Sequence, residues 1–212
     1  MSIELHDLRF SYGEKEVLRG IDLNVAPGER IGIEGTSGGG KSTLLKLLCG
    51  LYAPTGGTLL VQGAAAPADI RRKVSMVMQS AALLPVSIRE NITCGHEMPE
   101  EVVLHACAAA QLCGWIETLP QGLDTHVGER GGKVSGGQAQ RIAIARAIAK
   151  DAPVVLLDEI TSALDDATGT AVLDALKNLT RGKTVVSVSH KREALAHMTR
   201  IYRLEGGKLT HA

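Results

Sequence analysis

The sequence predicts an α/β protein: a parallel sheet wrapped by helices, with an antiparallel β portion before it and a mostly helical segment inserted into it. Three observations support this class. From residue 153 onward, strand-type and helix-type runs alternate. The first 25 residues hold two runs in which apolar and polar residues alternate, the pattern of half-exposed antiparallel strands. The middle third of the chain has helical rather than strand periodicity.

The N-terminal strands are expected at Ile3–Phe10 and Val17–Val25, on either side of a turn at Gly13–Lys15. A third strand, Arg30–Glu34, runs into a glycine-rich loop. The helix expected at Lys41–Cys49 carries four leucines and is therefore predicted to be buried. This order of strand, loop and helix opens the α/β core.

The remaining elements follow the same patterns. Further strands are expected at Gly57–Val61 and Val74–Met78, and helices of the inserted segment at Glu100–Ala110, Gln111–Thr118 and Gln138–Lys150. The last elements are expected at Val154–Leu157, Ala171–Leu179, Thr184–Val188, Arg192–Met198 and Ile201–Arg203, strand and helix in turn. We therefore expect one domain, with an α/β core at residues 1–79 and 151–212 and a helical subdomain at residues 80–150.

The composition excludes several classes of protein. Hydrophobic residues make up 44% of the chain and charged residues 22%, which excludes disorder. The 23 Lys and Arg balance the 23 Asp and Glu, so no net charge attracts a phosphate backbone and nucleic acid is not an expected partner. Four scattered cysteines indicate neither a zinc site nor a disulfide framework. With no signal pattern and no run of ~18 apolar residues, a cytoplasmic location is expected.

Residues 35–42 match the phosphate-loop pattern Gly-x-x-x-x-Gly-Lys-Ser/Thr between a predicted strand and a predicted helix. Glycines let successive backbone N–H groups point at one anion, and the helix dipole adds to the attraction. Lys41 is predicted to reach the β- and γ-phosphates, and Ser42 to bind magnesium. The alternative is a glycine-rich turn with an unrelated lysine. The predicted nucleotide contacts here are Gly35, Thr36, Ser37, Gly38, Gly39, Gly40, Lys41, Ser42 and Thr43.

Two carboxylates, Asp158 and Glu159, follow the continuous apolar run Val154–Leu157, which is typical of a strand buried on both faces. Functional groups gather at the carboxyl ends of such strands. Asp158 is suited to hold magnesium, and Glu159 to polarise a water in line with the γ-phosphate. The alternative is that both carboxylates cap the next helix.

A second anion-binding helix end is predicted where Ser135 precedes two glycines at the start of the helix that contains Arg141 and Arg146. The alternative is a helix cap with no ligand. Two phosphate-seeking helix ends far apart in sequence suggest that one of them serves a nucleotide held by a second copy. The predicted contacts are Ser135, Gly136, Gly137 and Gln138.

The order of these motifs resembles the nucleotide-binding domain of the ATP-binding cassette (ABC) family, over essentially the whole chain. The motifs that carry the resemblance are the phosphate loop, Gln79, Ser135–Gln138, Asp158–Glu159, Ser162–Asp165 and His190. The resemblance implies the ABC ATPase fold with a P-loop NTPase core, and ATP and Mg²⁺ as ligands. It implies that Glu159, His190, Gln79 and Lys41 are catalytic, and that Ser42, Gln79 and Asp158 bind the metal.

The resemblance also gives single residues a role. Tyr12 matches the aromatic residue that stacks on adenine, the alternative being a surface tyrosine. Gln79 matches a residue that contacts magnesium and the attacking water and senses the membrane partner. His190 matches the residue that binds the γ-phosphate, and Asp165 matches a loop that links the two sites of a dimer. Two cassettes pack head to tail in this family, so a homodimer on ATP binding is expected.

Two segments, Thr125–Gly131 and Ser87–Ile92, resemble the exporter branch, in which the first touches the transmembrane domains. The chain departs from that branch at Leu83-Leu84-Pro85, by ending soon after Lys208 and by having no transmembrane region. The implied function is an ATPase subunit, peripheral on the cytoplasmic face, that energises a transmembrane transporter on a separate chain. The alternatives are a soluble ABC ATPase acting on nucleic acid or ribosomes, and a regulatory cassette, which would have a degenerate site.

Overall fold

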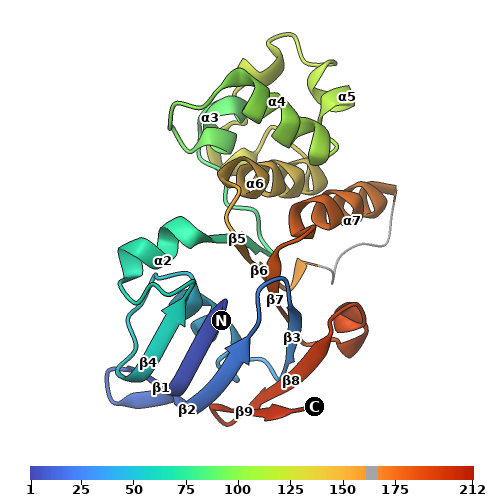
Figure 1. The fold of residues 1–212 in the computed structure, drawn as a ribbon. Coiled ribbons are helices and arrows are strands. Elements are labelled where there is room, and N and C mark those ends of the chain that lie inside the picture. The colour runs from blue at the N-terminus through green and yellow to red at the C-terminus, as the bar shows by residue number, and fades with distance from the viewer. Residues whose placement is uncertain (161–166) are drawn as a thin grey trace. The chain divides into compact units, whose positions relative to one another are not determined.

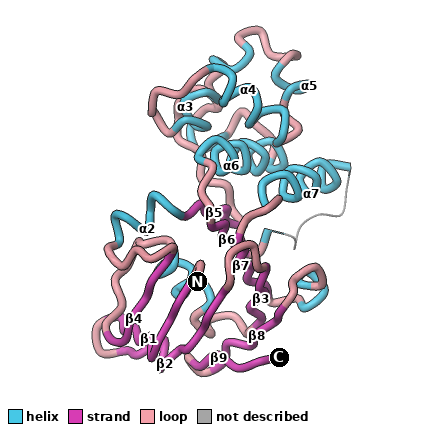
Figure 2. Tube along the Cα trace, in the orientation of Figure 1, coloured by secondary structure: helices cyan, strands magenta, loops and turns pink. Residues whose placement is uncertain are grey.

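The computed structural model describes the whole chain except residues 161–166. The described residues divide into two compact units, residues 1–76, 152–160 and 182–212 in the first and residues 77–151 and 167–181 in the second. The path of the chain is shown in Figure 1, and Figure 2 shows strands concentrated in the first unit and helices in the second.

A three-stranded antiparallel sheet opens the first unit, in the order β2-β1-β4. Strand β1 (Ile3–Tyr12) pairs with β2 (Lys15–Val25) and with β4 (Gly56–Val61). Tyr12 and Lys15 are partners across a two-residue turn, so both strands extend beyond the ranges expected from their apolar patterns. Alternate residues of β1 and β2 are buried in the core.

A six-stranded sheet follows, in the order β5-β6-β7-β3-β8-β9. Its strands are β3 (Arg30–Glu34), β5 (Val74–Met78), β6 (Val154–Asp158), β7 (Thr184–Ser189), β8 (Arg200–Glu205) and β9 (Lys208–His211). Strands β6, β7, β3 and β8 run parallel, and β9 is antiparallel to β8. The predicted fold class is therefore confirmed.

Helix α1 (Lys41–Leu48) follows the glycine-rich loop and buries all four of its leucines completely. Full burial of one such side chain contributes about 1.5–3 kcal/mol, so this helix is held by the core rather than by its own eight residues. Helix α2 (Pro67–Lys73) has a proline in its first turn. The 3₁₀ helix η4 (Arg192–Leu195) completes the first unit.

Several elements differ from the expected ones, and three of them differ for a local reason. The sequence did not indicate α2, because Pro67 and its alanine neighbours have no apolar period. Within the expected helix Arg192–Met198, only Arg192–Leu195 forms a 3₁₀ turn, which the Ala196 N–H closes on the Glu193 carbonyl. Strand β9 is short and largely exposed, so its pairing with β8 rather than its own pattern makes it a strand.

The second unit is helical, and takes in residues 167–181 as well as the expected segment 80–150. Its helices are α3 (Ile88–Thr93), α4 (Glu100–Ala109), α5 (Cys113–Ile116), α6 (Gly136–Lys150) and α7 (Ala167–Thr180), with 3₁₀ turns η1 (Gly122–Asp124) and η2 (Glu129–Gly131). Helix α3 has a capping box, in which the Ser87 hydroxyl accepts from the Glu90 N–H. Arg146 of α6 donates to the Asn91 carbonyl at 2.8 Å and so joins α6 to α3.

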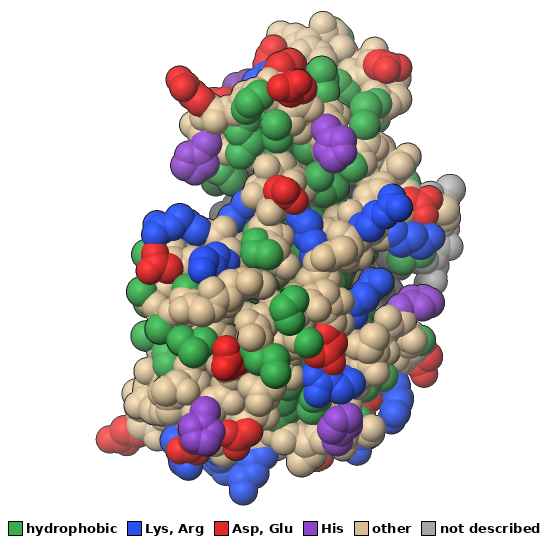
Figure 3. Space-filling model, viewed as in Figure 1, with side chains coloured by type: hydrophobic (Ala, Val, Ile, Leu, Met, Phe, Trp, Pro, Cys, Tyr) green, Lys and Arg blue, Asp and Glu red, His purple; other side chains and the backbone are tan. Residues whose placement is uncertain are grey.

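No helix among the described residues is long and apolar enough to span a bilayer. The visible surface carries positive and negative side chains interspersed with one another (Figure 3), in agreement with the balance of charges in the sequence. Such a surface has no extended patch of one sign on this face.

Candidate functional site

The carboxyl ends of four parallel strands meet at one edge of the large sheet. The strand register places Glu34 of β3 opposite both Ser189 of β7 and Arg203 of β8, and it places Asp158 of β6 opposite Val188. Loops that follow neighbouring parallel strands leave the sheet at the same edge, which is where open α/β sheets bind their ligands. The phosphate loop after β3, Glu159 after β6 and His190 after β7 therefore emerge side by side.

The phosphate loop is packed too closely for side chains at its glycines. A Cβ atom added at Gly35 would lie 2.3 Å from the carbonyl oxygen of Leu204, and one at Gly40 would lie 2.9 Å from Leu18. Gly38 and Gly40 also have φ angles of 78° and 101°, in the left-handed region that favours glycine. The Gly39 N–H donates to the Thr36 carbonyl at 3.1 Å. The glycines are thus required by the shape of the loop, which leaves a cradle of bare backbone.

The Lys41 ammonium is folded back over this loop. It is only 6% exposed and donates to the Gly35 carbonyl at 2.8 Å and to the Thr36 carbonyl at 3.0 Å. Both bonds are charge-assisted, and both hold the positive charge above the cradle. An anion bound there would meet a fixed ammonium as well as backbone N–H groups.

Asp158, at the end of β6, and Ser42, in the first turn of α1, are close enough for the Ser42 hydroxyl to act on the pKa of the Asp158 carboxyl. Burial, and then the charge of Glu159, raise the pKa of Asp158 above its ordinary value, while Lys41 and Ser42 act in the opposite direction. A carboxylate and a hydroxyl so close together form an oxygen donor set of the kind that Mg²⁺ takes when substrate phosphates and water complete its shell. The chemistry of this pair therefore fits magnesium.

Glu159 and His190 form the third contact of the site. The Glu159 Oε2 atom lies 3.2 Å from His190 Nδ1, with the histidine side chain 46% exposed and the glutamate side chain 22% exposed. Glu159 has a φ of 51°, which costs a non-glycine residue about 1–2 kcal/mol. Its N–H donates to the Val188 carbonyl at 3.0 Å, and this bond offsets part of that cost. The Glu159 carboxylate thus lies beside His190.

Tyr12 belongs to a cluster of three aromatic rings. Its ring packs edge-on against Phe10 at 4.8 Å and against Tyr52 at 5.7 Å between centroids, and its hydroxyl lies 3.5 Å from that of Thr43. The side chain is 42% exposed, so one surface of the ring is open to a ligand. Sequence reasoning did not find Tyr52, and its only signal is that the chain holds just five aromatic residues.

The second unit contains the remaining predicted contacts. Ser135 is the N-cap of α6: its hydroxyl accepts from the Gln138 N–H at 3.2 Å, and the Gln138 side chain accepts from the Ser135 N–H at 2.7 Å. Ser135 and Gly136 are exposed. Gln79 follows β5 directly and is also exposed. Asp165 lies outside the described residues.

The two exporter-like segments are neighbours in the second unit. The Ile88 N–H donates to the Thr125 carbonyl at 3.0 Å, and the Val127 N–H donates to the Val86 carbonyl at 3.1 Å. Glu129, the first residue of the turn η2, is exposed. These bonds place the segments Thr125–Gly131 and Ser87–Ile92 side by side, although they are far apart in the sequence.

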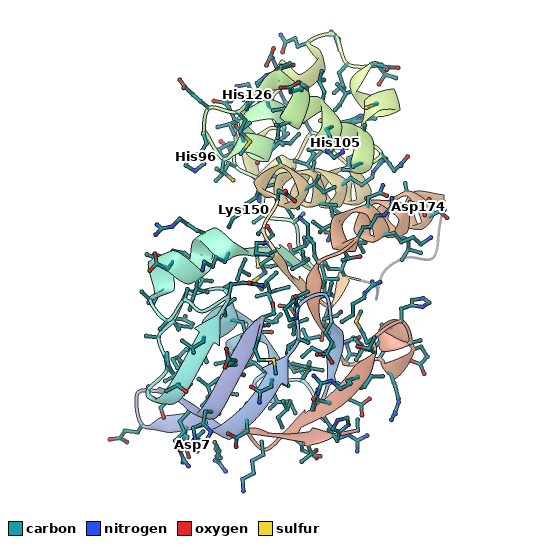
Figure 4. The ribbon with its side chains drawn as sticks, in the orientation of Figure 1. Asp7, His96, His105, His126, Lys150 and Asp174 are labelled. Carbon is teal, nitrogen blue, oxygen red and sulfur yellow. The ribbon has the colours of Figure 1, made fainter. Side chains whose placement is uncertain are left out.

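A preformed metal cluster does not occur among the residues that the structure describes: no group of three or more His, Cys, Asp or Glu side chains could hold an ion. His96, His105 and His126 of the second unit lie well apart and point outward (Figure 4). A magnesium ion at Ser42 and Asp158 would therefore depend on oxygens from its substrate.

Comparisons with known proteins agree with this arrangement. The model of the ABC transporter family matches residues 18–162. The chain is 40% identical to an ATP-dependent lipid A-core flippase of Burkholderia thailandensis, over 100% of the chain and 37% of the flippase. It is 41% identical to the Rhizobium etli "Beta-(1-->2)glucan export ATP-binding/permease protein NdvA", over 98% of the chain and 36% of that protein.

A solved bacterial ABC exporter with ATP bound has the same fold, with a TM-score of 0.89 and 35% identity over 99% of this chain and 38% of the exporter. The chain thus spans about 37% of the length of the curated relatives it matches. The family model covers the phosphate loop, Asp158 and Glu159, and the structural likeness covers nearly the whole chain. The chain belongs to the ABC transporter family, as an ATP-binding cassette domain of the exporter type.

Proposed function

We propose that this cassette hydrolyses ATP to ADP and phosphate with Mg²⁺, and that ATP-driven pairing of two cassettes powers an exporter. The observation that carries the proposal is the meeting of three groups at one sheet edge: Lys41 over a glycine cradle, Ser42 against Asp158, and Glu159 against His190. Each group supplies a function that phosphoryl transfer needs, namely phosphate charge neutralisation, metal binding and orientation of water.

In this proposal the triphosphate occupies the cradle, where Lys41 turns from the two loop carbonyls to the β- and γ-phosphates. Ser42 and Asp158 hold magnesium, which when bound neutralises charge on the β- and γ-oxygens. Glu159 orients a water whose oxygen attacks the γ-phosphorus, and accepts its proton as the bond to the bridging oxygen breaks. His190 holds the Glu159 carboxylate in place and contacts the γ-phosphate. Tyr12 stacks on adenine.

The second half of each site is proposed to come from another copy. Ser135 and Gly137 present a capped helix terminus with exposed N–H groups, a suitable cover for a γ-phosphate bound elsewhere. A head-to-tail pair of cassettes would then form two equivalent composite sites. Gln79 and Asp165 are proposed to connect these sites to each other and to the membrane partner.

The proposed membrane partner is a transmembrane transporter on a separate chain, docked at the surface formed by Thr125–Gly131 and Ser87–Ile92, with the cassette on the cytoplasmic face. The relatives are longer proteins, and NdvA is named a joint ATP-binding/permease protein. An immunoblot of the native cells distinguishes the two arrangements: a band near 22.3 kDa supports a separate chain, and a band near three times that size supports a fused one.

The proposal is tested by MgATP turnover of the purified cassette. Lys41→Ala should abolish turnover and weaken ATP binding, because the cradle loses the Lys41 ammonium. Lys208→Ala, which changes an exposed lysine on β9, is the matched control and should leave turnover unchanged. Near-normal turnover in Lys41→Ala would rule out the assigned site.

A further inference from the structure

A buried carboxylate stands directly before the phosphate loop. Glu34 ends β3, is 7% exposed, and is followed in the chain by Gly35. Its Oε1 accepts from Arg203 Nη2 at 2.7 Å and from Arg203 Nε at 3.0 Å, across the β3–β8 pair. Arg192 lies farther off, at 3.9 Å. No sequence pattern indicated this pair, whose members are 169 positions apart.

A negative charge at this point opposes the function proposed for the loop. A polyphosphate in the cradle would be repelled by an uncompensated carboxylate nearby, and the attraction from Lys41 would be partly cancelled. Glu34 hydrogen-bonds and attracts the Arg203 guanidinium and raises its pKa, so the arginine stays charged at any physiological pH. The pair therefore adds no net charge beside the phosphates.

The end of β8 is also in contact with the loop. The Leu204 carbonyl lies where a side chain at Gly35 or Gly39 would stand, 2.3 Å and 3.2 Å from the built Cβ atoms. Arg203 immediately precedes this carbonyl. A hollow of about 500 Å³ borders both elements, and is lined by Glu34, Thr36, Ser37, His190, Arg203 and Glu205. The ion pair and the phosphate loop thus share one surface.

We infer that Arg203 is a positioning residue that cancels the charge of Glu34, and so sets the affinity of the phosphate loop for polyphosphates. The inference rests on the proposed function, in which this loop binds ATP. This inference gives the Glu34–Arg203 ion pair an electrostatic role, which binding measurements distinguish from a purely structural role. Removing the arginine should weaken binding, whereas removing the carboxylate should strengthen it. A merely structural pair would lose affinity in both cases.

The chain offers a matched control at the other end of the same strands. Glu29, just before β3, pairs with Arg200 at the start of β8, with Arg200 Nη2 at 2.8 Å from Glu29 Oε2. Arg200→Gln therefore breaks a cross-strand ion pair of the same type, far from the carboxyl ends that carry the loop. It reports any general effect of loosening β8 on nucleotide binding.

Binding of MgATP, MgADP and adenosine is measured by titration calorimetry, with thermal unfolding of each variant recorded alongside. Arg203→Gln should weaken MgATP binding, because Arg192, at 3.9 Å, then compensates Glu34 only in part. The loss should be up to about tenfold, the order expected for one unit charge in a partly solvated site. The affinity for MgADP should fall less, and the affinity for adenosine should not change. Arg203→Lys keeps the charge and should stay within about threefold of the wild type.

Glu34→Gln should tighten MgATP binding about threefold, because it removes a negative charge beside the phosphate loop. The MgATP affinity of the double variant Glu34→Gln/Arg203→Gln should return to within about threefold of the wild type. The affinity of Arg200→Gln should equal that of the wild type. The inference is overturned if adenosine and MgATP lose affinity equally, if the double variant is not rescued, or if Glu34→Gln weakens binding. If the wild type itself binds no MgATP, the proposed function fails instead.

Discussion

Gly35→Ala tests whether the close approach of β8 shapes the phosphate loop. The added methyl carbon would lie 2.3 Å from the Leu204 carbonyl oxygen. Ordinary contact needs about 3.5 Å, so one backbone must move by about 1 Å. Overpacking costs about 1–3 kcal/mol, and a backbone obstacle cannot rotate away, so we expect about 3 kcal/mol. For a chain of this size, that lowers the melting temperature by about 6–12 °C.

Gly38→Ala is the matched control, since Gly38 has a φ of 78° and no atom within 4 Å of an added Cβ. It carries only the left-handed backbone cost of about 1–2 kcal/mol. Because Lys41 is bonded to the Gly35 carbonyl, Gly35→Ala should also lower MgATP turnover about a hundredfold. Differential scanning fluorimetry and a phosphate-release assay measure the two effects. Equal melting temperatures for the two variants would refute the steric argument.

Further variants address the composite site and the metal pair. Glu159→Gln keeps the shape but not the basicity of the side chain, so MgATP should bind without being cleaved. Dimers should then accumulate and be detected by sedimentation. A protein that stays monomeric at high concentration would contradict this. Ser135→Arg should leave ATP binding intact and abolish turnover, and unchanged turnover would mean that each copy acts alone. Burial raises the pKa of Asp158 above the ordinary 3.8, so the folded protein binds this proton more tightly than the unfolded chain does. The proton therefore adds to the free energy of unfolding at low pH, and this contribution is lost as pH rises through the raised pKa. Asp158→Asn should thus have a free energy of unfolding about 1 kcal/mol higher than the wild type at neutral pH, converge with it below about pH 4, and lose magnesium-dependent turnover. Glu129→Ala should leave basal turnover unchanged and uncouple it from a reconstituted membrane partner, whereas collapse of basal turnover would place Glu129 in the catalytic machinery.

The sequence by itself was sufficient to predict features that depend only on residues close to one another in the chain. The apolar period of residues 44–48 predicts a buried helix, and all four leucines there are fully buried. The glycine-rich residues 35–42 predict a phosphate loop, because the backbone of such a loop requires glycines at this spacing. The order of motifs predicted the ABC family, which the comparisons confirm. The site roles carried over from that family stay predictions.

Only the tertiary structure decided which distant residues meet. Strand register sets Glu34 opposite Arg203, and the Glu159 carboxylate lies beside His190. No local pattern encodes such a contact, because it depends on the order and alignment of strands that are paired across the whole chain. Strand β9 shows the same limit, since an exposed edge strand is made by its neighbour's free N–H and C=O groups and not by its own hydrophobic period. Local patterns determined what most segments are, and the sheet determined where their side chains act.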